Sequence, residues 1–146
     1  MEEVFVSCKV DYWFLHQIKD IVDDEKIIQN SKLEQIDANT LKSYKKKGFS
    51  DARIADLLEV DEQSVREHRY KLNVHPVFKR VDSCAAEFDS TTNYLYSTYE
   101  EFNESEVSNN KKIVVLGSGP NRIGQGIEFD YCCVQAALAF REENIE

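Results

Sequence analysis

The spacing of apolar side chains near the start of the chain predicts an amphipathic α-helix. These side chains recur at intervals of three and four residues, which places them along one face of a helix. They are Phe14, Ile18, Ile21 and Val22, and they are called the apolar stripe below. Asp11 is placed to cap the start of this helix near Tyr12, and we expect the helix to end near residue 30.

Three shorter helices are predicted to follow. The first runs from about residue 39 to residue 47 and is ended by Gly48, because glycine accepts the left-handed conformation found after helix ends. Ser50 and Asp61 are placed to cap the other two. We expect these helices to bury Ile54, Leu57, Leu58, Val65 and Leu72, and to turn Arg66, Glu67 and Arg69 outward. Pro76 ends the helical pattern.

The character of the sequence changes after Pro76. Residues 77–99 are rich in Thr, Ser, Tyr and Phe and predict extended chain that lies over other structure. Residues 100–110 combine glutamate with serine and asparagine, which is typical of a solvated linker. We therefore predict a helical domain with an extended C-terminal segment over 1–104, a linker over 105–110 and an α/β segment over 111–146.

A continuous apolar run, Ile113–Leu116, is typical of a buried parallel strand. A glycine-rich loop follows, and then a predicted helix from about residue 129 to 143, with Val134, Ala137 and Leu138 on its inner side. A parallel partner strand requires a crossover and further chain, and the sequence stops about where that second strand would begin. The fold class is therefore mixed, an all-α domain followed by the first strand and helix of a truncated α/β domain.

The loop between this strand and helix carries the candidate binding chemistry. Gly117 and Gly119 permit a tight turn and close backbone approach, and backbone N–H groups at the start of a helix can bind an anion. The dinucleotide-binding motif requires a third glycine where this chain has Arg122. The pattern thus favours a general strand–loop–helix unit over a nicotinamide site, and a plain structural turn stays open.

Two charged residues of the loop are candidate functional groups. Arg122 is suited to hold a carboxylate or phosphate through two hydrogen bonds. Glu128 either orients a neighbouring group or stabilises the start of the following helix through the helix dipole.

Residues 54–65 resemble the helix-turn-helix of DNA-binding regulators, with Ala55 and Val65 at fitting positions. The usual turn glycine is replaced by Glu59, and residues 50–72 carry six acidic against four basic residues. Duplex binding depends on contacts to phosphate, so this surface is a poor match for DNA. The same geometry is also a common way to pack two helices.

Composition narrows the classes of partner further. The net charge is −9, from 27 acidic and 18 basic residues, which disfavours nucleic acid and anionic membranes as partners. No apolar run approaches the roughly 20 residues of a membrane span, and the N-terminus lacks the pattern of a signal peptide. We expect a cytoplasmic protein. Its four cysteines, Cys8, Cys84, Cys132 and Cys133, lack zinc spacing and are interpreted as small buried residues, with a disulfide framework or metal site as the alternative.

Four blocks of sequence, in order, resemble one known family. Residues 116–133 (LGSGPNRIGQGIEFDYCC) look like the opening of the second synthetase half of carbamoyl phosphate synthase large subunits. Residues 77–88 and 96–101 resemble the stretch before it. Residues 11–15 and 48–55 resemble the oligomerisation domain of the same family.

The resemblance implies an enzyme that makes carbamoyl phosphate from bicarbonate, glutamine-derived ammonia and two ATP, for pyrimidine and arginine biosynthesis. It implies ATP, Mg²⁺ or Mn²⁺, and K⁺ for the full subunit, a partner amidotransferase (glutaminase), and self-association through the helical domain. The α/β segment would be the start of a Rossmann-like pre-ATP-grasp domain. None of these ligands is expected to be held by this piece alone, which should be inactive.

In the family, the loop after this strand lines a tunnel for carbamate. By position, the resemblance makes Arg122, Gly126 and Glu128 the expected tunnel residues, with Gly117, Gly119 and Gly124 shaping the loop backbone. The loop sequence is more similar to bacterial and plant forms, and a plant source would allow a plastid location. Two alternatives are a non-catalytic helical interaction module from a split or decaying gene and, more remotely, a helix-turn-helix DNA-binding protein.

Overall fold

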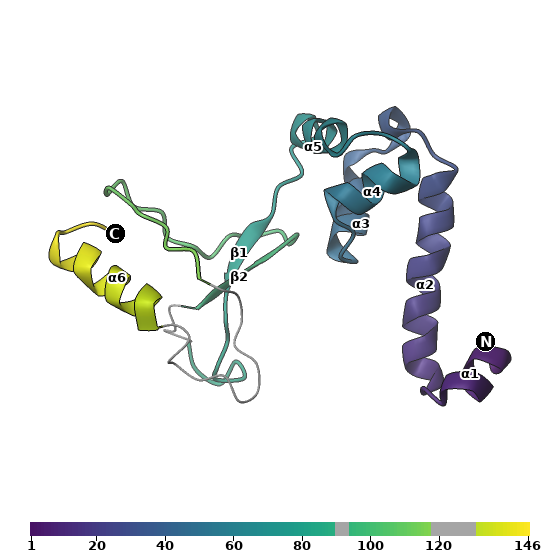
Figure 1. Cartoon of the computed structure of the whole chain (residues 1–146), viewed down its shortest axis with the longest axis horizontal. Helices are drawn as coiled ribbons and strands as arrows, with labels where there is room; N and C mark the ends of the chain where they lie inside the picture. The colour runs from purple at the N-terminus through teal and green to yellow at the C-terminus, as the bar shows by residue number, and fades with distance from the viewer. Residues whose placement is uncertain (90–93, 118–130) are drawn as a thin grey trace. The chain divides into compact units, whose positions relative to one another are not determined.

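The computed structural model describes residues 1–89, 94–117 and 131–146, and it divides into two compact units, Met1–Ser105 and Glu106–Glu146. In the first unit the elements are α1 (Glu2–Cys8), α2 (Tyr12–Gln29), the 3₁₀ helix η1 (Leu33–Gln35), α3 (Ala38–Lys46), α4 (Asp51–Leu58), α5 (Glu62–Lys71), β1 (Val77–Arg80) and β2 (Leu95–Thr98) (Figure 1). The second unit contains α6 (Tyr131–Glu142). The described chain is therefore mainly helical, with a small sheet of two antiparallel strands.

One hydrophobic core joins the C-terminal end of α2 to η1, α3, α4 and α5. Its four fully buried large side chains are Ile28, Leu41, Ile54 and Val65. Ile36, Tyr44, Phe49, Ala55 and Leu57 complete it, and Leu33, Leu58 and Leu72 pack against it while partly exposed. The inward faces predicted for α4 and α5 are thus confirmed, with Leu58 and Leu72 at the margin of the core.

Helix caps fix where the helices begin. The carboxylates of Asp11 and Asp61 accept backbone N–H groups of Trp13 at 2.8 Å and Ser64 at 2.9 Å. The Ser50 hydroxyl accepts the N–H of Arg53 at 3.0 Å. All three predicted caps are confirmed, and each satisfies a donor that the helix itself leaves unpaired.

Gly48 separates α3 from α4 and has a φ of +97°. L-residues rarely adopt this region, so glycine is the residue that permits the sharp change of direction. The chain then returns at once to the core through Phe49, whose ring packs edge-to-face on Tyr44 at 5.9 Å between centroids. The predicted end of α3 at Gly48 is confirmed.

The first helix, α1, is not anticipated by the sequence pattern. It spans seven residues, buries none of them, and ends at Lys9 in the left-handed conformation with φ 57°. A helix this short with no buried face gives too few apolar repeats to be distinguished from an extended run. The apolar stripe on α2 is exposed in this chain, from 41% at Ile21 to 56% at Phe14.

Two parts of the stretch predicted as extended after Pro76, Val77–Arg80 and Leu95–Thr98, pair as antiparallel strands. Val77 pairs with Thr98 and Arg80 with Leu95, in antiparallel register. The opposite edge of β1 is also occupied, because Asn103 accepts the N–H of Phe78 and a Glu104 carboxylate oxygen accepts that of Arg80, each at 2.8 Å. Extended structure is confirmed only for these two strands, because residues 83–88 form turns and bends with Ala85 and Ala86 at positive φ. The pairing between β1 and β2 was not predicted.

The strand predicted over Ile113–Leu116 is not formed in the described chain, and this prediction is wrong for the 146-residue chain. Two backbone hydrogen bonds do place Glu146 beside the first residues of the predicted strand. The N–H of Ile113 donates to Glu146 at 2.7 Å, and the N–H of Glu146 donates to Lys111 at 2.9 Å. This is the bonding pattern of a parallel pair, but a ladder needs partner groups along its whole length.

Helix α6 buries no residue, so the predicted inner positions, Val134, Ala137 and Leu138, are not buried here. The second unit, as described, contains no sheet against which they could pack. Among the described helices, none is both long and apolar enough to cross a membrane.

Replacing a buried and an exposed isoleucine should separate core from surface. Ile54→Ala removes a fully buried side chain and should lower the free energy of unfolding by about 2–5 kcal/mol. Ile18→Ala, at a position 55% exposed in α2, should change it by less than about 0.5 kcal/mol. Urea unfolding followed by circular dichroism measures both. Equal losses would contradict the placement of these two residues.

Candidate functional site

All three predicted tunnel residues, Arg122, Gly126 and Glu128, lie outside the described residues. Two of the three glycines predicted to shape the loop backbone, Gly119 and Gly124, also lie outside them. Gly117, the third loop glycine, is described, and it is exposed at the end of a stretch without regular secondary structure, residues 111–117. Their predicted roles therefore stay predictions.

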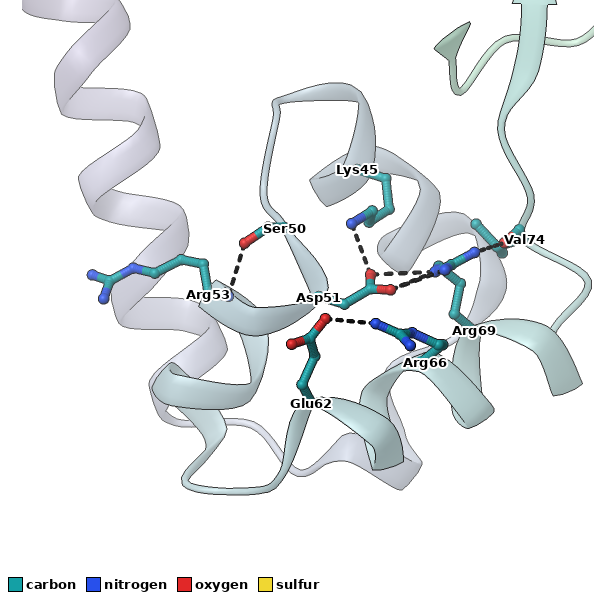
Figure 2. A network of polar contacts seen from close by, with 8 residues as sticks. All are labelled: Lys45, Ser50, Asp51, Arg53, Glu62, Arg66, Arg69 and Val74. Carbon is teal, nitrogen blue, oxygen red and sulfur yellow. Dashed lines mark hydrogen bonds and ion pairs between the residues drawn. The ribbon is translucent and has the colours of Figure 1, made fainter. Parts of the chain in front are cut away.

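The described residues contain one buried ionic network, centred on Asp51 (Figure 2). Arg69 donates from Nε and Nη2 to the Asp51 carboxylate, with the shortest contact at 2.9 Å, and Lys45 donates from Nζ at 2.7 Å. Arg69 also donates from Nη1 to the backbone oxygen of Val74 at 3.0 Å. The side chain of Lys45 is 7% exposed, and those of Asp51 and Arg69 are each 9% exposed.

Local structure explains how Asp51 reaches its partners. Ser50 caps α4, which makes Asp51 the first residue of that helix, where the positive end of the helix dipole favours a carboxylate. Lys45 comes from the last turn of α3 and Arg69 from the last turn of α5. One carboxylate therefore joins three helices, and Val74 extends the network into the segment that leads to β1.

The outward orientation predicted for Arg69 is wrong, because the residue is only 7% exposed. Arg69 lies one helical turn after the fully buried Val65, so both occupy the same face of α5. The spacing of Arg69 from Val65 predicts a buried side chain, whereas its charge predicts an exposed one. Its partner, Asp51, lies 18 residues earlier in the chain, so the local sequence does not reveal the ion pair.

The electrostatics of the network favour its charged form. Burial opposes ionisation of Asp51, but hydrogen bonds from Arg69 and Lys45 outweigh it and hold the pKa of Asp51 below its ordinary value. Burial likewise disfavours charged Arg69, yet the hydrogen bond to Asp51 raises its pKa above the usual range. The charges engage one another, so the network fixes the helices and offers no free acid or base.

Helix α3 also contacts the chain that follows β2. Lys45 lies over the Tyr99 ring, 5.5 Å from its centroid, and burial raises the pKa of the Tyr99 hydroxyl. Lys42 pairs with Glu101 at 2.8 Å and Lys46 with Glu100 at 3.4 Å. The described helical core and the hairpin are thereby connected through one face of α3.

The α4–α5 pair has the packing expected of a helix-turn-helix, with Glu59 in the left-handed conformation at the turn. Three of the four basic residues in this window are in ion pairs: Arg53 with Glu25, Arg66 with Glu62, and Arg69 with Asp51. An arginine that is already paired contributes less to a phosphate contact. This supports the interpretation of the motif as a packing unit.

The cysteines are free thiols, and the prediction that they are buried is wrong. Cys8 and Cys132 are exposed, and Cys84 and Cys133 are partly exposed. Cys8 and the adjacent pair lie on α1 and α6, two helices that bury no residue in this chain. The described residues contain no group of three or more His, Cys, Asp or Glu side chains able to hold a metal ion.

Comparison with known proteins defines the class to which this helical unit belongs. Residues 1–73 match the family model described as the carbamoyl-phosphate synthetase large chain, oligomerisation domain. Residues 109–146 match the model described as the carbamoyl phosphate synthase preATP-grasp domain. The first unit thus contains an oligomerisation domain, and the second unit contains the matched part of a preATP-grasp domain.

Similar proteins extend the match over the whole chain. The carbamoyl phosphate synthase large chain of Neisseria meningitidis serogroup A is 59% identical over 146 residues, and that of Pseudomonas aeruginosa is 58% identical. Each match covers all of this chain and 14% of the relative. The chain belongs to the carbamoyl phosphate synthase large-chain family, and it spans about 14% of the length of the curated relatives it matches.

Neutralising Asp51 should destabilise the helical unit strongly. Asp51→Asn leaves Arg69 and Lys45 buried without a counter-charge, and breaking a buried pair in this way costs about 3–5 kcal/mol. Asp56→Asn, on the exposed side of the same helix, is the matched control and should cost less than about 0.5 kcal/mol. Urea unfolding at pH 7 tests both; similar losses would contradict the network.

The difference between native Asp51 and Asp51→Asn should also depend on pH. Because the folded pKa of Asp51 is below its ordinary value of 3.8, its ionised form stabilises the fold above that value. This contribution is lost as the pH falls through the folded pKa. The gap in unfolding free energy should therefore shrink in acid and stay constant from about pH 6 to pH 8. A gap independent of pH would contradict the assignment.

Proposed function

We propose that this chain is part of the large subunit of a glutamine-hydrolysing carbamoyl phosphate synthase, which forms carbamoyl phosphate from bicarbonate, ammonia and two ATP. The observation that carries the proposal is the match to large chains at 54–59% identity, which includes both units. The chain's own share of that function is subunit association through the helical unit and one part of a carbamate tunnel.

The helical unit is suited to association because it is held internally by charge as well as by its core. The Asp51 network fixes α3, α4 and α5, so the surfaces of these helices keep a defined shape. We propose that the unit self-associates and that the full subunit binds a small amidotransferase that supplies ammonia. The setting would be pyrimidine and arginine biosynthesis in the cytoplasm, or in a plastid if the source is a plant.

The tunnel role belongs to the loop after residue 116. We propose that Arg122 and Glu128 guide the unstable carbamate and keep bulk water out, while Gly126 leaves the bore open because it has no side chain. Gly117, Gly119 and Gly124 would allow the backbone to follow the required turns.

Among the described residues, no group of three or more His, Cys, Asp or Glu side chains could hold a metal ion. We propose that ATP, the divalent ion and K⁺ bind parts of the full subunit outside this chain, and that the chain alone is inactive.

The isolated chain should show no bicarbonate-dependent ATPase activity. Phosphate release would be measured with bicarbonate and ATP, beside a complete large chain as positive control. Turnover by the 146-residue chain above that of a heat-denatured sample would contradict the proposal that it supplies association and a tunnel wall without catalysis.

In the complete enzyme, Gly126→Phe should uncouple the two partial activities. A bulky side chain would block passage of carbamate, so carbamoyl phosphate formation should fall by about tenfold or more while bicarbonate-dependent ATP hydrolysis is largely retained. Gly126→Ala is the control with a small side chain and should have a smaller effect. Equal loss of both activities in Gly126→Phe would argue against a tunnel role.

A further inference from the structure

The hairpin formed by β1 and β2 joins the helical core through two stems at the same end of the strands. Val77 pairs with Thr98 at this end. The chain therefore enters β1 through residues 74–76, the first stem, and leaves β2 through residues 99–101, the second stem. How each stem is held decides how the hairpin is attached to the helices.

The first stem is held by buried groups. The backbone oxygen of Val74 accepts from Nη1 of Arg69 at 3.0 Å, and the N–H of Val74 donates to the backbone oxygen of Arg69 at 3.0 Å. Val74 is 5% exposed, and Arg69 is itself paired with the buried Asp51. Moving this stem would disturb a buried ion pair, which is costly because a buried charge would lose its partner.

The second stem is held by charge near the surface. Glu101 pairs with Lys42 at 2.8 Å and Glu100 with Lys46 at 3.4 Å, and we call these two ion pairs the latch. The two lysines are one turn apart on the same face of α3. The four side chains are 28–66% exposed. The hydrogen bond from Lys42 lowers the pKa of Glu101 below its ordinary value, so this pair is charged at neutral pH.

Other lysines at the end of α3 have different partners. Lys45 pairs with Asp51 of α4 at 2.7 Å, and Lys47 pairs with Asp24 of α2. Lys45 also lies 5.5 Å from the centroid of the Tyr99 ring in the second stem. A cation over a ring face has no single partner atom, so this contact allows the ring to shift. The position of the second stem therefore depends on the latch.

Beyond the latch, the chain crosses to the other edge of β1. The backbone N–H of Phe78 donates to the side-chain oxygen of Asn103, and the N–H of Glu104 donates to the oxygen of Phe78, each at 2.8 Å. A Glu104 carboxylate oxygen also accepts from Nζ of Lys79 at 3.0 Å. Strand β1 thus has β2 on one edge and residues 103–104 on the other. We call these three segments the hairpin body, because they are joined by their own hydrogen bonds.

The two stems differ in how easily they can be released. The first stem depends on a buried charge network, whereas the second depends on exposed ion pairs. Exposed pairs contribute little to stability and are screened by salt, while buried pairs are screened much less. The hairpin body is therefore held firmly at one stem and weakly at the other.

We propose that the latch is a salt-dependent device that holds the hairpin body against α3 and opens without unfolding it. When both ion pairs break, the hairpin body turns about the first stem, while the Asp51 network and the strand pairing remain. Residues 103–104 belong to the hairpin body, so the latch also sets where the chain leaves the helical unit toward residues 105–110.

Distances between two spin labels in the complete large chain test the latch. Nitroxide labels on non-canonical amino acids replace Ser43 and Tyr96, which are exposed on α3 and β2. Lys42→Glu together with Lys46→Glu replaces both attractions with repulsions, so the distance distribution from double electron–electron resonance should become about twofold broader. Raising the salt concentration from about 0.1 M to about 1 M should broaden the native distribution as well, because the Debye length falls from about 10 Å to about 3 Å.

A charge exchange and a matched control show whether the pairing itself is responsible. Adding Glu100→Lys and Glu101→Lys to the doubly substituted chain restores opposite charges and should return the distribution to its native width. Lys19→Glu together with Lys26→Glu changes the net charge equally, but these lysines pair with Asp23 of their own helix. This control should leave the distribution unchanged.

Hydrogen exchange of the backbone amides in β1 and β2 completes the test. A broader distribution with unchanged exchange in both strands supports the proposal. Faster exchange throughout the strands would mean that the hairpin body unfolds, and this would overturn it. An unchanged distribution after Lys42→Glu with Lys46→Glu would overturn it too, as would a charge exchange that fails to restore the native width.

Discussion

The bidentate contact between Arg69 and Asp51 is the interaction on which the arrangement of the helical unit depends. Arg69 and Lys45 converge on the first residue of α4, so one carboxylate joins the ends of three helices. The same guanidinium holds the oxygen of Val74, which leads into β1. A buried ion pair is not a strong source of stability, because desolvation offsets much of the attraction. Its effect is to make any other packing of these helices costly, since that would leave a buried charge unpaired.

The apolar core and this network contribute to the fold in different ways. Burial of apolar side chains stabilises the fold but does not specify one arrangement of the helices, because hydrophobic contacts are not directional. The side chains buried most completely are Ile28, Leu41, Ile54 and Val65. The ionic contacts and the caps at Ser50 and Asp61 select one arrangement of the helices. The helical unit thus has a well-packed half, which includes α3, α4 and α5. Helix α1 buries no residue, and the apolar stripe of α2 is exposed in this chain.

The second unit illustrates the opposite case, in which local sequence preference is not sufficient. Ile113–Leu116 has the composition of a buried strand, yet its residues are 37–87% exposed and form no ladder. The two bonds between Lys111, Ile113 and Glu146 show the geometry of a parallel pairing at its first residues. Parallel strands gain stability only when neighbours on both edges and helices on the faces are present together. A strand of this kind is therefore a property of the complete sheet.

The sequence by itself determined the local features. Asp11, Ser50 and Asp61 mark helix starts and Gly48 marks a helix end, because caps and positive φ depend on a few neighbouring atoms. It also determined the family, through blocks of residues in a fixed order. The tertiary structure alone decided the burial of Arg69, the pairing of β1 with β2, and the exposure of the apolar stripe. Each depends on a partner distant in the chain, and the charge of Arg69 or the hydrophobicity of Ile18 does not reveal whether that partner is present.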